Sequence, residues 1–240
     1  ESTFGFVTGP VMTNIVSIAC GHGHTLCVRN DGTVAASAYG FYSTGGQANV
    51  PVGLSNVVAV AGGYSHSLAL KEDGTLVAWG KDASRNPIVV PAELSNVIAV
   101  AAGDWHTVAL KSDGTVVTWG SQNSRGQLSI PAGLSNVVAV SAGSEHSIAL
   151  KANGTVVAWG RSGGAIQTPP TGLTNVAMIS AEGWHNLAVR TDGTAVGWGS
   201  SSRSYLTPPP GLCDVLAVAD GFHHSLALTN GGKLVVWGYS

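Results

Sequence analysis

A histidine returns along this chain at a spacing of about 40 residues, and an aromatic-glycine pair follows it each time. The histidines are His24, His66, His106, His146, His185 and His224, and the aromatic residues are Tyr39, Trp79, Trp119, Trp159, Trp198 and Trp237. A fixed period of this length means that every unit is the same supersecondary piece, which cannot bury its apolar face alone. We therefore expect one repeat domain over residues 1–240, whose function lies where the units differ.

Each unit contains short β-strand patterns separated by turns, as residues 91–130 illustrate. The runs VIAVAAG, HTVALK and VVTWG are apolar or alternating and end at turn residues, and residues 127–130 predict a short fourth strand. Asp113-Gly114 predicts a tight hairpin in which both central residues have positive φ. Four short antiparallel strands in every unit predict an all-β fold, a six-bladed β-propeller of four-stranded antiparallel blades.

The two ends of the chain predict how the last blade is completed. The last unit stops just after Trp237-Gly238, before a fourth strand, and residues 4–8 resemble the missing strand. We expect this N-terminal strand to complete the last blade, because an open sheet edge can pair with another chain. The start at Glu1, without a methionine or signal peptide, predicts a mature or trimmed form.

Composition argues against several classes of function. Charged residues make up only 10% of the chain and the net charge is −2 without a basic run, which argues against nucleic-acid binding. No apolar stretch is long enough to span a membrane. Few lysines with much Ser, Thr and Gly predict a secreted or extracellular protein, which we expect to be a monomer. Cys20 and Cys27 stand where other units have small residues, which favours small buried side chains, although a Cys20–Cys27 disulfide stays open.

The repeated histidines, tryptophans and aspartates have structural explanations. Zinc needs several ligands at about 2 Å, and equivalent residues around a ring would be too far apart, so we expect each imidazole to hydrogen-bond a neighbouring turn. The doublets His22/His24 and His223/His224 leave an adventitious metal open. We predict core positions for the Trp-Gly rings and a hairpin role for Asp113. No partnered carboxylates for acid–base catalysis can be identified, so we expect no cofactor, no metal and no enzymatic activity.

The turns vary at one end of the units and stay nearly constant at the other. The first-to-second and third-to-fourth turns vary, whereas the Asp-Gly turn and the Leu-Ser-Asn connection barely change. Repeats that keep their scaffold and change one set of loops use those loops for recognition, and large aromatics with Arg are typical of protein-binding hot spots. The predicted partner-binding residues are Tyr64, Asp104, Trp105, Glu145, Trp184, Phe222, His223, Arg85, Arg125 and Arg203. Rings that merely cover gaps between blades, and solvated loop arginines, are the structural alternative.

The recurring signature resembles the regulator of chromosome condensation repeat family over essentially the whole chain. Its carriers include Gly103 through His106, Ala109-Leu110, Asp113-Gly114 and Trp119-Gly120, whereas WD-repeat propellers carry Gly-His and Trp-Asp. The eukaryotic founder of the family has longer repeats, an exchange-factor wedge and chromatin contacts, and these compact units lack the insertion and a basic tail, so nucleotide exchange is not expected. The compact units are more similar to the bacterial branch, which includes the seven-bladed, secreted β-lactamase inhibitory protein II.

This resemblance implies a bacterial, inhibitor-like binding propeller. Together with the variable turns it predicts a non-enzymatic module that presents an aromatic-rich face to a protein partner, with a bacterial enzyme such as a β-lactamase as one candidate. Two alternatives stay open: a carbohydrate-binding propeller, whose exposed rings stack on sugars, and a propeller enzyme that uses its central channel.

Overall fold

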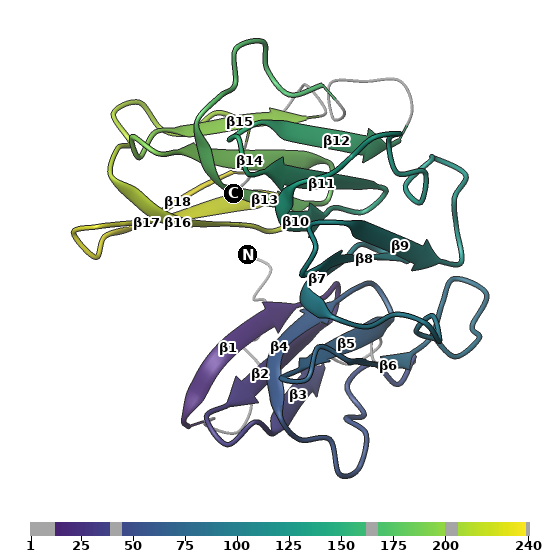
Figure 1. The fold of residues 1–240 in the computed structure, drawn as a ribbon. Coiled ribbons are helices and arrows are strands. Elements are labelled where there is room, and N and C mark those ends of the chain that lie inside the picture. The colour runs from purple at the N-terminus through teal and green to yellow at the C-terminus, as the bar shows by residue number, and fades with distance from the viewer. Residues whose placement is uncertain (1–12, 39–44, 162–167, 200–205, 239–240) are drawn as a thin grey trace, which may run out of the picture. The chain divides into compact units, whose positions relative to one another are not determined.

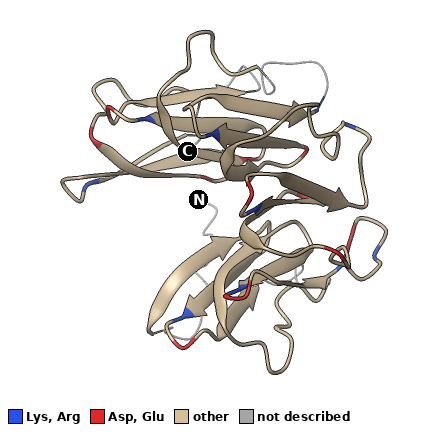
Figure 2. Cartoon of the chain, in the orientation of Figure 1, with Lys and Arg blue, Asp and Glu red and all other residues tan. Residues whose placement is uncertain are grey.

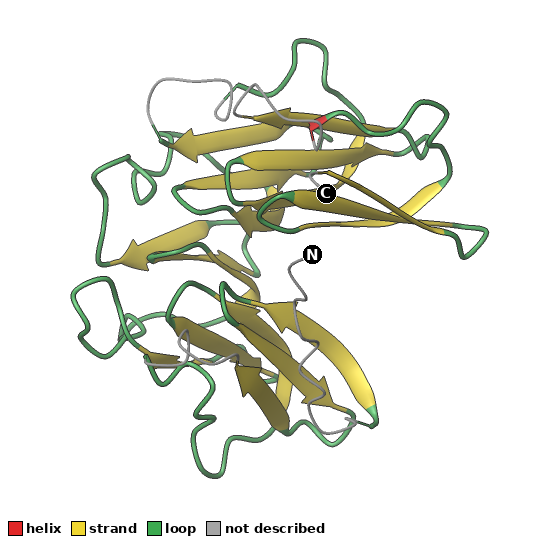
Figure 3. Cartoon of the chain, turned by 180° about the vertical axis from the view of Figure 1, so that it is seen from behind, coloured by secondary structure: helices red, strands yellow, loops and turns green. Residues whose placement is uncertain are grey.

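The computed structural model describes residues 13–38, 45–161, 168–199 and 206–238. They form six sheets, each a meander of three consecutive antiparallel strands, which we number blades 1 to 6 (Figures 1 and 3). The chain divides into two compact units, residues 1–94 with blades 1 and 2, and residues 95–240 with blades 3 to 6. No helix within the described ranges is long and apolar enough to cross a membrane. The closing strand expected at residues 4–8 lies outside the described residues.

The six blades repeat the same three strand lengths with small variations. In the first unit, the strands are β1 (Ile15–Cys20), β2 (His24–Arg29), β3 (Val34–Ala38), β4 (Val57–Gly62), β5 (His66–Lys71) and β6 (Leu76–Gly80). Blades 3 and 4 contain β7 (Val97–Ala102), β8 (His106–Lys111), β9 (Val116–Gly120), β10 (Val137–Ala142), β11 (His146–Lys151) and β12 (Val156–Gly160). Blades 5 and 6 contain β13 (Val176–Glu182), β14 (His185–Arg190), β15 (Ala195–Gly199), β16 (Val215–Asp220), β17 (His224–Thr229) and β18 (Leu234–Gly238).

Within the residues that the structure describes, each blade has three strands, so the expected four-stranded blade is wrong. In blade 3, residues 127–130 form turns instead of the expected fourth strand. The side-chain oxygen of Asn123 accepts the backbone N–H of Leu128 (2.9 Å), and the Leu128 carbonyl accepts the hydroxyl of Thr118 (2.9 Å). Side chains thus satisfy the backbone groups of Leu128 that a strand would have offered to a neighbouring strand.

The Asp-Gly turns also differ from the expected hairpin, because only the glycine has a positive φ. In blade 3, Gly114 has a φ of +78° and its N–H donates to the Lys111 carbonyl (2.9 Å). The Asp113 carboxylate accepts the backbone N–H of Thr115 (3.0 Å) and its hydroxyl (2.6 Å). The turn role predicted for Asp113 is therefore confirmed. The same pair of bonds recurs at Asp31, Asp73, Asn153 and Asp192.

Backbone hydrogen bonds tie the invariant end of one blade to the next. The N–H of Val137, which begins blade 4, donates to the Gly114 carbonyl in the Asp-Gly turn of blade 3 (3.1 Å). Asn136, just before it, adopts a φ of +56° and accepts the N–H of Ala152 (2.8 Å). These backbone requirements explain why the Asp-Gly turn and the asparagine hardly vary among units.

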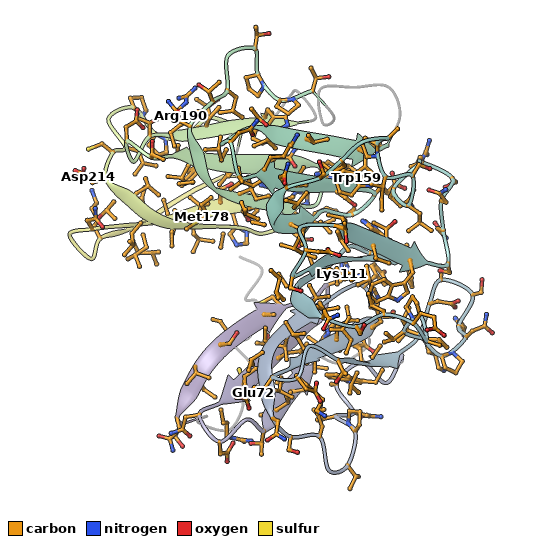
Figure 4. All side chains as sticks on the ribbon, in the orientation of Figure 1. Glu72, Lys111, Trp159, Met178, Arg190 and Asp214 are labelled. Atoms are coloured by element: carbon orange, nitrogen blue, oxygen red, sulfur yellow. The ribbon has the colours of Figure 1, made fainter. Side chains whose placement is uncertain are left out.

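Histidines and tryptophans hold the blades together. The partner of the imidazole is a strand residue of the next blade, and not the neighbouring turn that the sequence predicted. His146 Nε2 lies 2.8 Å from Asn186 Oδ1 of the next blade, and both side chains are fully buried. Trp159, labelled in Figure 4, is 4% exposed, and its indole N–H donates to the Gln127 carbonyl (3.0 Å). Equivalent bonds join His24 to Ser67, His106 to Ser147, and Trp79 to the Gln47 carbonyl. The core roles of these rings are confirmed.

The cysteines do not form the disulfide that the sequence left open. Cys20, Cys27 and Cys213 are all free thiols. Cys27 is buried and lies opposite Ile18 in the strand ladder, whereas Cys20 is exposed and lies opposite Thr25. The prediction of a small buried side chain is therefore confirmed for Cys27 and wrong for Cys20.

Candidate functional site

The variable turns lie at one end of each blade, opposite the Asp-Gly turns. The residue after the third strand lies at the same end. Its backbone N–H donates to the backbone carbonyl of the residue just before the histidine. This bond joins Arg161 to the Glu145 carbonyl (3.0 Å), Ser121 to Trp105 (3.3 Å) and Lys81 to Ser65 (2.8 Å). Figure 2 shows that charged residues lie mainly in the turns and near the strand ends. The variable side chains of a blade are thus fixed to a rigid β-scaffold.

Backbone bonds also hold the variable turns of neighbouring blades side by side within each unit. In the second unit, Asp104 N–H donates to the Ser144 carbonyl (3.3 Å), and Ser144 N–H donates to the Gly183 carbonyl (2.9 Å). In the first unit, His22 N–H donates to the Gly63 carbonyl (3.2 Å). Side chains on successive turns can therefore form one continuous surface.

Six side chains from blades 3 to 6 form a chain of contacts, which we name the Arg161 cluster. Its members are Arg125, Glu145, Arg161, Trp184, Phe222 and His223. At its centre, Arg161 Nη1 donates to Glu145 Oε2 at 2.7 Å, a charge-assisted hydrogen bond. The same guanidinium lies over the Trp184 ring, with its carbon 4.8 Å from the ring centroid, which is a cation–π contact. Arg161 thus links an acidic turn to an aromatic one.

The cluster extends from this centre in both directions. On one side, Arg125 Nε lies 3.7 Å from the same Glu145 oxygen, and the arginine side chain is 53% exposed. On the other side, the rings of Trp184 and Phe222 are 5.9 Å apart at an angle of 55°, and His223 meets the Phe222 ring edge-on at 4.7 Å. The Arg161 cluster therefore runs from cationic side chains to aromatic side chains across blades 3 to 6.

The structure brings together some of the predicted site residues and places others elsewhere. Arg125, Glu145, Trp184, Phe222 and His223 belong to the Arg161 cluster. Asp104 and Trp105 lie on the variable turn of blade 3, in the same unit, where both are half-buried. Their backbones bond to the neighbouring turns described above.

The remaining predicted residues lie in the first unit or outside the described ranges. Tyr64 stacks on His22 of the adjacent blade, with ring centroids 4.3 Å apart. Arg85 is exposed in the turn after β6, with a φ of +65°. Arg203 lies outside the described residues. In the histidine doublet, His24 bonds Ser67 at 2.8 Å and His22 stacks on Tyr64.

Sequence reasoning missed Arg161, which the structure places at the centre of the cluster. The loop arginines that it selected lie four or more residues beyond the Trp-Gly pair, whereas Arg161 follows Gly160 directly. Lys81 and Ser121 hold the equivalent position in blades 2 and 3. Comparing this position among the units would have revealed a further variable residue at the recognition end.

A buried polar group lies between blades 5 and 6. Asp220 Oδ1 lies 3.1 Å from His185 Nε2 and accepts the Ser225 hydroxyl at 2.9 Å, and the side chains of His185 and Asp220 have no exposed area. Burial, helped by the negative charges of Asp104 and Asp220, raises the pKa of the nearby Glu182 carboxyl to about 7. Within the described ranges, no group of three or more His, Cys, Asp or Glu side chains could hold a metal ion.

This buried group has the composition of a hydrolase triad but not its geometry. A Ser-His-Asp triad uses opposite ring nitrogens of the histidine for the serine and for the aspartate. In this protein the same nitrogen, His185 Nε2, faces both Ser225 Oγ (3.3 Å) and Asp220 Oδ1 (3.1 Å). The complete burial of Ser225 also denies its hydroxyl to a substrate. The arrangement therefore joins two blades and does not form a nucleophile.

The comparisons with known proteins agree with the fold. The family model of the Regulator of chromosome condensation (RCC1) repeat matches residues 57–84, 97–127 and 137–163. No curated protein matches the chain. Among solved structures, Prp20p from Saccharomyces cerevisiae is similar with a TM-score of 0.77 and 20% identity, over 93% of this chain and 72% of that one.

Two further structures show the same likeness. Human WBSCR16 matches with a TM-score of 0.71 and 20% identity, over 93% of this chain and 76% of that one. The ectodomain of the receptor kinase CR4 from Physcomitrella patens matches with a TM-score of 0.77 and 22% identity, over 94% of this chain and 64% of that one. At these identities the likeness shows the fold alone. Prp20p itself has been studied for its binding to Gsp1p and histones, and yeast RCC1 (Prp20) has been solved bound to Kap60.

Proposed function

We propose that this RCC1-like repeat propeller is a non-enzymatic binding module whose Arg161 cluster contacts a protein partner. The observation that carries this proposal is the preformed contact between Glu145, Arg161 and Trp184 on the variable turns. Tryptophan and arginine are the residues most enriched at protein-binding hot spots. Because their partners already hold these side chains, binding costs less conformational entropy than it would with free side chains.

The geometry of Trp184 favours a protein partner over a sugar. A carbohydrate-binding aromatic residue needs an open ring face on which the sugar stacks. The Arg161 guanidinium covers one face of Trp184, and Phe222 packs against the same ring. The Ser225–His185–Asp220 group gives no support to the enzyme alternative, because its serine is fully buried and out of reach of a substrate.

The proposal has a finer form, in which the protein is secreted by a bacterium and inhibits a bacterial enzyme, with a β-lactamase as the first candidate. The low charge and the compact repeat units support it. Binding of one face to an enzyme would also use a continuous strip such as the Arg161 cluster.

The test combines purified β-lactamases with a bacterial secretome. The full chain is immobilised, and bound proteins are identified by mass spectrometry and measured by surface plasmon resonance. We expect Trp184→Ala and Phe222→Ala each to lower the affinity for the partner by roughly 10- to 30-fold, which is the range of a hot-spot residue. Lys111→Ala, at the invariant Asp-Gly end of blade 3, is the control and should leave affinity unchanged.

Two results would contradict the proposal. One is a partner whose affinity is the same for wild type, Trp184→Ala and Phe222→Ala but falls for Lys111→Ala, because binding would then use the other end. The other is a glycan-array signal that disappears with Trp184→Ala, which would favour the carbohydrate-binding alternative.

A further inference from the structure

The Arg161 cluster contains more positive than negative charge. It holds two guanidinium groups, those of Arg125 and Arg161, and one carboxylate, that of Glu145. These three side chains together carry a net charge of +1, whereas the chain as a whole has a net charge of −2. Such a local reversal attracts an anionic group on a partner.

The two arginines differ in how far they are already engaged. Arg161 forms the 2.7 Å bond to Glu145 and lies over the Trp184 ring. Arg125 approaches Glu145 only through Nε at 3.7 Å, which is beyond hydrogen-bond distance, and its side chain is more than half exposed. Arg125 is therefore the arginine whose guanidinium can bind a new anion.

The backbone of Arg125 is nevertheless well positioned. Its N–H donates to the side-chain oxygen of Gln127 (3.1 Å), and Gln127 is 2% exposed. The Gln127 carbonyl in turn accepts the indole N–H of Trp159. A buried network thus holds the base of the arginine while its guanidinium faces solvent.

From this arrangement, and resting on the proposed function, we infer that the partner segment carries a carboxylate a few residues away from an aromatic or large aliphatic side chain. The carboxylate binds the Arg125 guanidinium, whose planar fork matches it with two parallel hydrogen bonds. The apolar side chain packs beside the rings of Trp184 and Phe222. A phosphate, with nearly two negative charges, is less favourable because Glu145 already lies next to Arg125.

A phage-displayed library of random 12-residue peptides, selected on the intact chain, tests this inference. Peptides that lose binding on Trp184→Ala are kept, synthesised and titrated by calorimetry. We expect them to share an Asp or Glu near an aromatic or aliphatic residue. Arg125→Ala should lower the affinity of these peptides by about tenfold or more. Arg125→Lys should lower the affinity less, because lysine keeps the positive charge but lacks the planar guanidinium that forms two parallel hydrogen bonds. Arg190→Ala, which changes an arginine at the Asp-Gly end of blade 5, should have no effect.

A double-mutant cycle gives the sharpest result. Changing the peptide Asp to Asn should weaken binding to the wild-type protein but have little effect on Arg125→Ala. Selected peptides without an acidic residue, or unchanged affinity with Arg125→Ala, would each overturn the inference and leave the proposed binding end in place. If no peptide and no protein binds at the Trp184 end, the proposed function falls together with it.

Discussion

At the scale of single residues, Glu182 is the most informative exception to the repeat. Other blades have a glycine at this position, and a Cβ at Gly143 would lie 2.2 Å from Cε1 of His146. Blade 5 accommodates the larger side chain by extending β13 by one residue, so that Glu182 pairs with His185. The glycine moves to Gly183, where φ is +50°. One substitution thus reshapes the turn that carries Trp184.

The buried carboxyl of Glu182 predicts a pH-dependent contribution to stability. Its pKa is raised from 4.5 to about 7 by burial, so between these values the folded protein holds a proton that the unfolded chain has lost. The contribution of Glu182 to the free energy of unfolding therefore falls as pH rises from about 4.5 to about 7. Glu182→Gln should be more stable than wild type by about 1 to 3 kcal/mol at pH 7.5.

Urea unfolding at pH 4.5 and pH 7.5 measures this effect. The advantage of Glu182→Gln should shrink at pH 4.5, where the wild-type carboxyl is almost fully protonated in the folded protein and about half protonated in the unfolded chain. Glu93→Gln, at an exposed position, serves as the control and should follow wild type at both pH values. Equal stabilities of Glu182→Gln and wild type at pH 7.5 would contradict the prediction.

At the scale of strands, the bond between neighbouring blades explains the residue that follows four of the six histidines. That residue is Ser67, Ser147 or Ser225 in blades 2, 4 and 6, and Asn186 in blade 5. Each accepts or donates a hydrogen bond with the histidine of the preceding blade. A local sequence feature of one strand is therefore a requirement of the adjacent sheet.

Asn186 tests this role of the strand. Asn186→Ala should lower the free energy of unfolding by about 1 to 3 kcal/mol, because His146 Nε2 would lose its partner in a fully buried site. Asn186→Ser should cost less, since serine fills the equivalent position in three other blades. Thermal and urea unfolding measure both, and an alanine variant as stable as the serine variant would contradict the role.

Strands were more predictable than the details of their pairing. The three strand patterns of each unit and the position of the Asp-Gly turn are confirmed, because they depend on local alternation and on glycine. The register shift at the second residue of each first strand was not predicted. It leaves five large apolar side chains at least half exposed, namely Val16, Val58, Ile98, Val138 and Leu216. The fourth strand predicted in blade 3 is absent because side-chain bonds from Asn123 and Thr118 satisfy the backbone groups of Leu128.

At the scale of the whole molecule, buried histidines determine the response to acid. Burial lowers the pKa of His24, His66 and His146 to about 4, from an ordinary value of 6.5. Between pH 6.5 and 4 the unfolded chain is protonated at these sites while the folded protein is not. Acid therefore destabilises the fold, in the direction opposite to the effect of Glu182, and three histidines outweigh one glutamate.

We expect the free energy of unfolding to fall steeply from pH 6.5 to pH 4.5. Each buried histidine contributes at most about 1.4 kcal/mol per pH unit. Urea titrations at half-unit steps measure the slope, and His146→Gln should reduce it by about one proton per molecule. A free energy of unfolding that stays constant over this range would show that the three imidazoles are protonated in the folded state.

The sequence by itself determined the number of blades, the strand order within each and the structural roles of the repeated His, Trp and Asp residues. These features recur from unit to unit and depend on local periodicity, turn chemistry and burial. Each unit of the chain therefore supports the same prediction. The tertiary structure decided the three-stranded blade, the environment of Glu182 and the central place of Arg161. Those depend on contacts between different blades, such as Arg161 with Glu145 and Trp184, and the distances and angles of such contacts arise only when the sheets pack.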